Sequence, residues 1–282
     1  MVAVGSAPPP FNLTIISTSG SQKTVILEND DSDDTMPDWS PDGKNLVFAS
    51  NVSGNYDIYV LEVEGNNLPQ QITMHTGADM HPAWSPDGER IAFESKRDDG
   101  DWDIWVIKVD GSDLRNLTAD SNAHDGNPTW SPDGKQIIFS SDRGEDFDLF
   151  VMTADGTGET RQLTNMRGDE YHPDWSPDGK DIVFRHTDMN TGQRQIYFVK
   201  LDGLPPVQHF SGQSNDDSPS WSPNSRWLTF ESDAANPGIS NQPGKFDVYI
   251  YDFWTGDISQ VTSGDKTYRY PAWKPTRTGI NP

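Results

Sequence analysis

A tryptophan that stands two residues after a proline recurs six times along this 282-residue chain, and this repeat constrains the fold more than any other feature. The repeated residues are Trp39, Trp84, Trp130, Trp175, Trp221 and Trp273, spaced by 45, 46, 45, 46 and 52 residues. Self-similarity with a period of about 20–50 residues is typical of solenoids, propellers and other repeat architectures. The sequence therefore indicates six copies of one structural unit.

Each copy carries signals for four short strands. The tryptophan ends the first strand, and Ser-Pro-Asp-Gly or a variant follows, a sequence in which Pro and Gly suit a tight turn. A hydrophobic residue seven positions after the tryptophan lies in the second strand, and an alternating run such as DIYVLEV from Asp57 forms the third. An Ile-Thr or Leu-Thr pair, as at Thr73, marks the fourth. No helical period of 10–15 residues interrupts these signals, which excludes βαβ folds.

Four antiparallel strands per unit, repeated radially, predict an all-β, six-bladed β-propeller. We expect residues 1–282 to form a single propeller domain. The large loops between strands, including the 232–245 segment, are expected at one face, with the Ser-Pro turns at the other. The six repeated tryptophans are expected to pack between blades, because a buried indole contributes a large apolar area.

The two ends of the chain predict how the ring closes. The last unit reaches Ile280, where its second strand should begin, and stops soon after. At the other end, residues 13–20 align with residues 104–111, a third strand. We therefore expect a blade with its first strand from the C-terminus and its other three from the N-terminus. Residues 2–5 should then pair with the strand around Pro271–Trp273.

Composition excludes several classes of protein. The chain has 44 acidic and 21 basic residues, a net charge of −23, which disfavours binding to nucleic acid. It has no cysteine, so disulfides and thiolate catalysis are excluded. No apolar run approaches the roughly 18 residues of a membrane span, so we expect no membrane insertion. The first ten residues lack the basic start and apolar stretch of a signal peptide.

The pattern P-x-W-S-P-D-G, followed by D-I-Y and L-T, resembles the WD40-like PD40 repeats of TolB-type propellers over essentially the whole chain. The fifth unit departs from it at Asn224-Ser225 and the sixth at residues 274–277, and the α/β domain that precedes the propeller in TolB is absent from this sequence. The resemblance implies a monomeric, periplasmic or extracellular bacterial protein. It also implies a non-catalytic binding or scaffold propeller that recognises a protein or peptide at the face around its central channel. A sensor module of a longer protein, or an appendage of a peptidase, are alternatives.

Acidic residues stand five positions before five of the tryptophans, at the start of the innermost strands. They are Asp34, Asp79, Asp125, Glu170 and Asp216, with Tyr268 in the sixth unit. By the symmetry of the ring we expect these acids to surround one mouth of the channel. Such an acidic collar could bind a cation such as Ca²⁺ or a basic segment of a partner. The alternative is that each carboxylate caps a local turn.

A second set of candidates stands three positions before each tryptophan: Met36, His81, Asn127, His172, Ser218 and Tyr270. His81 and His172 suggest either two hydrogen-bonded histidines or a transition metal at the channel mouth, although two histidines without a third are a weak metal set. The metal would imply a metal-dependent lyase or hydrolase acting on sugars, our alternative function.

Tyr268, Arg269 and Tyr270 break the symmetry of the ring and join the predicted partner-binding residues. No G-x-S-x-G, H-E-x-x-H or P-loop motif is present, so no catalytic residue is predicted.

Overall fold

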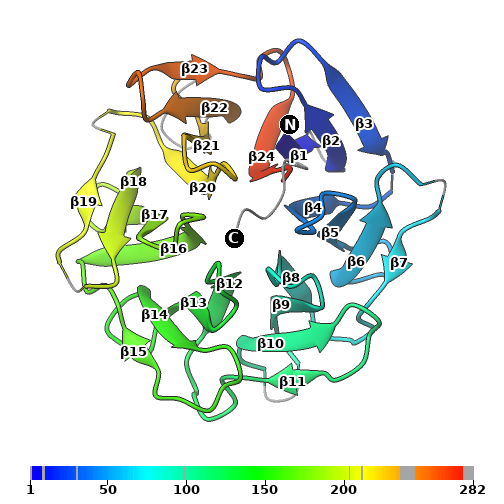
Figure 1. Cartoon of the computed structure of the whole chain (residues 1–282), viewed down its shortest axis with the longest axis vertical. Coiled ribbons are helices and arrows are strands. Elements are labelled where there is room, and N and C mark those ends of the chain that lie inside the picture. The colour runs from blue at the N-terminus through cyan, green and yellow to red at the C-terminus, as the bar shows by residue number, and fades with distance from the viewer. Residues whose placement is uncertain are drawn as a thin grey trace.

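The computed structural model describes most of the chain. The described residues are 2–7, 10–29, 31–65, 67–97, 100–202, 204–210, 212–235 and 245–275. Their strands form four-stranded antiparallel sheets arranged around a central axis (Figure 1). This confirms the prediction of an all-β propeller with four-stranded antiparallel blades. Among the described residues, no helix has the length and apolarity needed to cross a lipid bilayer.

Within each sheet the four strands lie side by side, in order from the centre of the ring to its outer edge. The innermost strands are β4 (Asp34–Trp39), β8 (Asp79–Trp84), β12 (Asp125–Trp130), β16 (Gly168–Trp175), β20 (Asp216–Trp221) and β24 (Thr267–Trp273). The second strands are β5 (Asn45–Ser50), β9 (Arg90–Ser95), β13 (Gln136–Ser141), β17 (Asp181–Asp188), β21 (Trp227–Ser232) and β1 (Val2–Ala7). The third strands are β6 (Asp57–Glu62), β10 (Asp103–Lys108), β14 (Asp148–Thr153), β18 (Arg194–Lys200), β22 (Asp247–Asp252) and β2 (Asn12–Ile16). The outermost strands are β7 (Gln70–Gln71), β11 (Arg115–Asn116), β15 (Arg161–Gln162), β19 (Val207–Gln208), β23 (Ile258–Gln260) and β3 (Lys23–Leu27).

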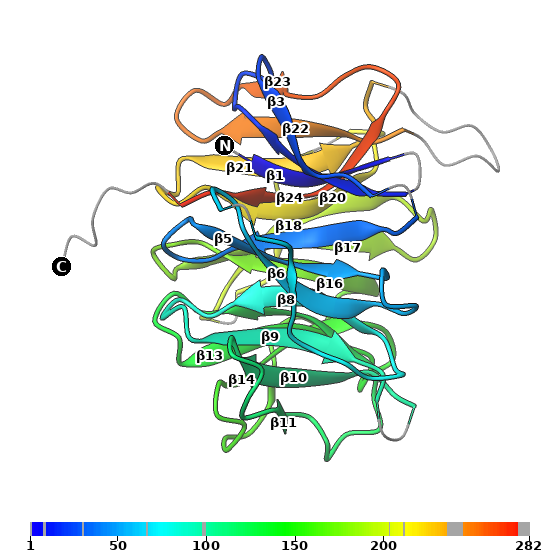
Figure 2. The ribbon, with the colours of Figure 1, turned by 90° about the vertical axis from the view of Figure 1, so that its right-hand side faces the viewer.

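Five sheets consist of strands that are consecutive in sequence, and we number these blades 1 to 5 from β4 onward. The remaining sheet, blade 6, has the order β24-β1-β2-β3 and so joins the two ends of the chain (Figures 1 and 2). In this sheet Val2 pairs with Trp273 and Ala3 with Ala272, antiparallel. The predicted pairing of residues 2–5 with the strand around Trp273 is therefore confirmed.

The core lies within the blades and between neighbouring blades. Phe48, Phe93, Phe139 and Phe184 occupy equivalent positions in the second strands and are fully buried. Each repeated tryptophan packs against the preceding blade: Trp130 of blade 3, for example, contacts Ile104 and Val106 of blade 2. The prediction that the tryptophans pack between blades is confirmed, and these contacts hold the innermost strands around the channel.

Candidate functional site

Each innermost strand is interrupted by a bulge of one residue followed by proline. The ladder between β8 and β9, for example, shifts register between Met80 and Ala83, so His81 and Pro82 have no partner in it. All six residues before these prolines have a left-handed backbone, with φ between 47° and 54°: Met36, His81, Asn127, His172, Ser218 and Tyr270. This conformation is uncommon outside glycine and tends to gather at functional sites.

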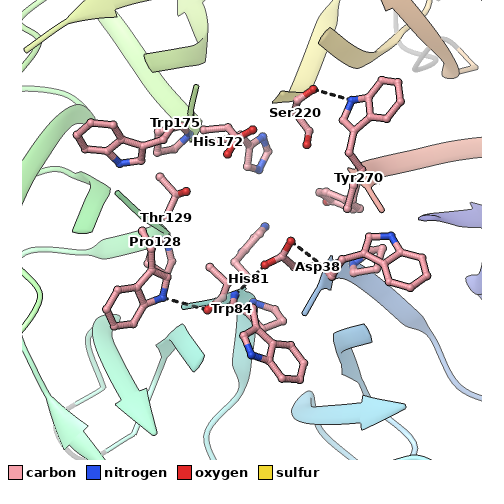
Figure 3. Close-up of a pocket in the computed structure, with 18 of the residues that line it drawn as sticks. Asp38, His81, Trp84, Pro128, Thr129, His172, Trp175, Ser220 and Tyr270 are labelled. Carbon is pink, nitrogen blue, oxygen red and sulfur yellow. Dashed lines mark hydrogen bonds between the residues drawn. The ribbon is translucent and has the colours of Figure 1, made fainter. Parts of the chain in front are cut away.

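The bulges surround a cavity of about 400 Å³ in the central channel (Figure 3). The six bulge residues and the prolines that follow them line it, so every blade contributes, and five of the six repeated tryptophans, all except Trp221, line it as well. Prolines of the Ser-Pro turns, including Pro86, Pro132 and Pro177, complete the lining. The cavity therefore extends toward the turn end of the channel, whereas we predicted the binding site at the loop end.

Three aromatic side chains meet in the channel at the level of the bulges. His81, His172 and Tyr270 come from β8, β16 and β24, which are alternate blades. The ring centroids of His81 and His172 are 5.5 Å apart, and each lies 6.0 Å from the centroid of Tyr270. We call these residues the three-ring cluster. The structure thus brings together three of the residues that the sequence singled out.

A buried carboxylate stands beside each histidine of the cluster. His81 Nδ1 lies 2.9 Å from Glu94 Oε1, and His172 Nδ1 lies 2.7 Å from Asp217 Oδ1. Burial opposes ionisation of Glu94, but the neighbouring His81 and the N–H of Asn127 outweigh it and lower its pKa. Burial lowers the pKa of His172 despite the attraction of Asp217. A carboxylate therefore lies beside Nδ1 of both imidazoles, and at His172 it forms a hydrogen bond.

Arginines compensate the carboxylates at the channel. Asp217 is 2.9 Å from Nη1 of Arg194 and 3.5 Å from Nε of Arg185. Burial opposes its ionisation, but His172 and these arginines hold its pKa well below the usual range. Glu231 Oε2 accepts a hydrogen bond of 2.6 Å from Arg269 Nε. Asp217 and Glu231 are thus each paired with arginine.

Sequence reasoning missed Glu94, Asp217 and Glu231. Two of these positions carried a readable signal, because Glu94 and Glu231 each follow the buried phenylalanine of a second strand. A charged residue in a buried strand indicates a nearby polar or charged partner.

The five predicted collar acids begin or lie near the beginning of the innermost strands, as expected, but their side chains are buried. Asp34, Asp79, Asp125, Glu170 and Asp216 are each at most 3% exposed. Asp79 accepts a hydrogen bond from Arg97, Asp125 from Arg143, and Asp216 from Ser232. Their partners lie in the same blade, so the expectation that these acids form an accessible collar at the mouth is wrong. A contribution of these acids to partner binding stays a prediction.

Glu170 has a histidine as its ion-pair partner, where Asp79 and Asp125 each have an arginine. His186 Nδ1 lies 2.7 Å from its Oε1, and Thr164 donates a hydrogen bond of 3.0 Å to its Oε2. Burial raises the pKa of Glu170 to about 7, and the same effect, together with Glu170 itself, raises the pKa of Asp148 to about 7.

The asymmetric segment of the sixth unit divides between two places. Tyr268 is buried in blade 6, where its hydroxyl accepts a hydrogen bond of 3.3 Å from Lys23. Arg269 pairs with Glu231 of blade 5, and Tyr270 lines the cavity. Two of the three residues therefore lie at the channel.

Two further carboxylates line the cavity from blades on opposite sides of the ring. Asp38 lies on β4 and Asp174 on β16, in each case between the bulge proline and the tryptophan. Asp38 accepts the N–H of Trp84 at 2.7 Å, and Asp174 accepts that of Trp221 at 2.7 Å. Burial raises the pKa of Asp38 to about 6 and that of Asp174 to about 7. In the sequence both aspartates are part of the repeat motif, and neither was predicted as a residue of the site.

Within the described residues, no group of three or more histidine, aspartate or glutamate side chains is arranged to hold a metal ion. Neither the Ca²⁺ nor the transition metal considered from the sequence is tested by this observation, and both stay predictions.

Comparison with known proteins identifies the family. The sequence matches the PD40 family, described as the TolB beta propeller domain, over residues 9–101, 97–188 and 156–280. The chain belongs to this family. The resemblance to PD40 repeats of TolB-type propellers is thereby confirmed. No curated protein sequence matches the chain.

Solved structures agree with the family at the level of fold. TolB from Acinetobacter baumannii has a TM-score of 0.83 at 22% identity, over 98% of this chain and 66% of that one. A putative TolB from Agrobacterium tumefaciens has a TM-score of 0.79 at 24% identity, over 97% and 94%. An oligogalacturonate lyase in complex with manganese has a TM-score of 0.60 at 17% identity, over 94% and 75%. At these identities the likeness establishes the fold alone.

Proposed function

We propose that this TolB-like propeller is a non-catalytic binding module that takes up part of a protein partner at its central channel. The cavity of about 400 Å³ that all six innermost strands build carries this proposal. Ligand sites are typically preformed, mostly apolar hollows with a few placed polar groups. Proline and tryptophan side chains supply the apolar lining here, and Asp38, Asp174 and Thr129 supply polar groups.

The two histidines of the channel are the residues on which the alternative function, an enzyme, would depend. A metal-dependent lyase or hydrolase would use the imidazoles of His81 and His172 as ligands or as acid and base. In this channel the Nδ1 atom of each ring faces a carboxylate. Elemental analysis of the purified protein tests the alternative, since a stoichiometric transition metal would favour the enzyme. Calorimetric titration with Ca²⁺ tests the predicted cation in the same way.

A basic segment is the partner chemistry that fits best. The net charge of −23 attracts cations over long range, and Asp38 and Asp174 place carboxylates inside the cavity. Membership of the TolB β-propeller family supports a periplasmic location. Fractionation of bacteria that express the native gene tests the location.

Filling the cavity tests the binding function. Ala83 lines the cavity between the bulge and Trp84, so Ala83→Phe should occupy part of its volume. Ala119 is exposed, and Ala119→Phe is the matched control. A photo-crosslinking residue at Thr129 should capture the partner in cells, and Ala83→Phe should abolish capture while Ala119→Phe preserves it. Equal capture by both variants, with unchanged folding by circular dichroism, would show that the channel does not bind the partner.

A further inference from the structure

A continuous row of aromatic rings crosses the loop face, outside the cavity. The ring centroids of Trp102 and His124 are 5.6 Å apart, those of His124 and Phe147 5.3 Å, and those of Phe147 and Tyr171 4.7 Å. Tyr171 in turn lies 6.4 Å from His172 of the three-ring cluster. We call Trp102, His124, Phe147 and Tyr171 the aromatic strip. All four residues are half-buried, so each keeps part of its surface in contact with solvent.

The backbone holds the strip rigidly. Trp102 and Phe147 directly precede the third strands of blades 2 and 3. The carbonyl of Trp102 accepts the N–H of Asp125 at 2.8 Å, and that of Phe147 accepts the N–H of Glu170 at 2.7 Å. Each bond ties the start of a third strand to the innermost strand of the next blade. The rings are therefore preorganised, which lowers the entropic cost of binding.

Three aspartates stand beside the strip. Asp142 accepts the N–H of His124 at 2.7 Å, Asp169 accepts that of Phe147 at 3.3 Å, and Asp146 accepts that of Gly168 at 2.9 Å. Each of these bonds uses one carboxylate oxygen. No lysine or arginine in the described part of the chain lies within ion-pair distance of these three aspartates. Elsewhere in the blades, buried acids such as Asp79 and Asp125 do have an arginine partner.

We propose that the aromatic strip, with Asp142, Asp146 and Asp169, is a docking surface for an extended peptide segment that carries arginine or lysine. Cations bind over aromatic faces and are favoured further by nearby carboxylates. The protein already uses this contact internally, since the guanidinium of Arg185 lies 4.5 Å from the ring centroid of Tyr171. Charge complementarity selects a basic peptide over a neutral sugar, which would stack on the rings but leave the aspartates without a counter-charge. This inference rests on the proposed binding function and adds a second surface to it.

Fluorescence anisotropy of a labelled nine-residue peptide of alternating arginine and glycine, titrated with the full chain, tests the proposal. The triple variant Asp142→Asn, Asp146→Asn and Asp169→Asn removes three charges, while the amide oxygens can still accept the backbone hydrogen bonds. Its matched control is Asp42→Asn, Asp133→Asn and Asp178→Asn at exposed Ser-Pro turns. Asn224 occupies the equivalent turn position in blade 5 and accepts equivalent hydrogen bonds from Ser222 and Arg226, so asparagine fits there.

We expect the strip variant to weaken peptide binding by about tenfold or more and the control to change it by less than about twofold. Both triple variants alter the net charge equally, so equal weakening would assign binding to the overall field and overturn the proposal. Absence of binding to the wild-type protein at low salt would overturn it as well.

The aromatic contribution is tested separately. Trp102→Ala should weaken peptide binding, and Trp102→Phe should restore most of it. Trp254→Ala is the control, because Trp254 is 77% exposed and lies outside the strip. If Trp102→Ala instead abolishes binding of a neutral oligosaccharide while the aspartate variants bind the peptide normally, the strip is a sugar surface and the proposal fails. Partner capture through the cavity, measured with Ala83→Phe, reports on the proposed function independently of these results.

Discussion

The imidazole rings of His81 and His172 lie 5.5 Å apart, although the two residues belong to different blades with a third blade between them. Asn127 of that intervening blade connects them. Its N–H donates to Glu94, the carboxylate beside His81, and its Oδ1 accepts the N–H of His172 at 3.4 Å. These residues are therefore hydrogen-bonded across three blades. Substitutions that change their charges should alter the free energy of unfolding.

Asp217→Asn should destabilise the protein at neutral pH by about 3 kcal/mol, because Arg185, Arg194 and His172 lose the carboxylate that compensates them. The pKa of Asp217 is depressed in the folded state, so its contribution is present above its ordinary pKa of 3.8 and is lost as the pH falls below that value. Urea unfolding should show the full difference in stability between variant and wild type at pH 7 and a smaller difference at pH 3. Asp257→Asn, at an exposed position, is the control.

Arg97→Met should be strongly destabilising, by about 3–5 kcal/mol, because it leaves Asp79 buried without its counter-charge. Arg115→Met removes an arginine whose pair with Asp113 is exposed, and it should leave the unfolding midpoint unchanged. Chemical denaturation of the two variants makes the comparison. A midpoint for Arg97→Met equal to that of the wild type would mean that Asp79 is not held by this pair.

Asp174→Asn should stabilise the protein in alkaline solution. Burial raises the pKa of Asp174 to about 7 from 3.8, so the wild type loses stability as the pH rises from about 4 to about 7, and asparagine avoids this loss. Between about pH 4 and pH 7 the folded wild type holds the proton, and its stability rises as the pH falls. The gain in melting temperature from Asp174→Asn should therefore be a few degrees at pH 8.5 and smaller at pH 5. A gain that is the same at both values would contradict the raised pKa.

Ser225→Gly should stabilise the protein by about 1 kcal/mol. Ser225 has a φ of 54° at the turn position where blades 1 to 4 have glycines, such as Gly88 with a φ of 77°. Glycine adopts this conformation without strain from a Cβ atom. The reverse change, Gly88→Ser, should lower the melting temperature because it places a Cβ atom at this positive φ. The added Cβ would meet only ordinary van der Waals contacts, so no clash contributes to the loss. Scanning calorimetry of both variants should give shifts of opposite sign.

The repeat predicted the architecture because its period, its turns and its strand alternation all indicate the same unit, a four-stranded antiparallel blade. The closure of the ring was also predictable, since the terminal segments align with strands missing from the last unit. His81, His172 and Tyr270 could be grouped because equivalent positions in a symmetric ring face the same axis.

The collar could not be placed correctly because a position at the start of an innermost strand, repeated by the symmetry of the ring, does not fix which way the side chain points. In an uninterrupted strand, residues two apart share a face, so Asp79 and His81 would both face the channel. The bulge at His81 and Pro82 breaks this alternation, and Asp79 points into its blade toward Arg97. Nothing in the spacing reveals which side of a bulge a residue faces. The carboxylate partners were hidden for a related reason, because they lie on neighbouring strands and blades.

The left-handed bulge has a consequence for how such a ring acquires new specificities. The backbone and the proline that follows determine the bulge conformation. Methionine, histidine, asparagine, serine and tyrosine all adopt it in this protein. Duplicating a unit therefore copies a position already aimed at the common axis, while its side chain stays free to vary. Changing the chemistry of the channel requires single substitutions at six interchangeable positions, and the scaffold does not have to be redesigned.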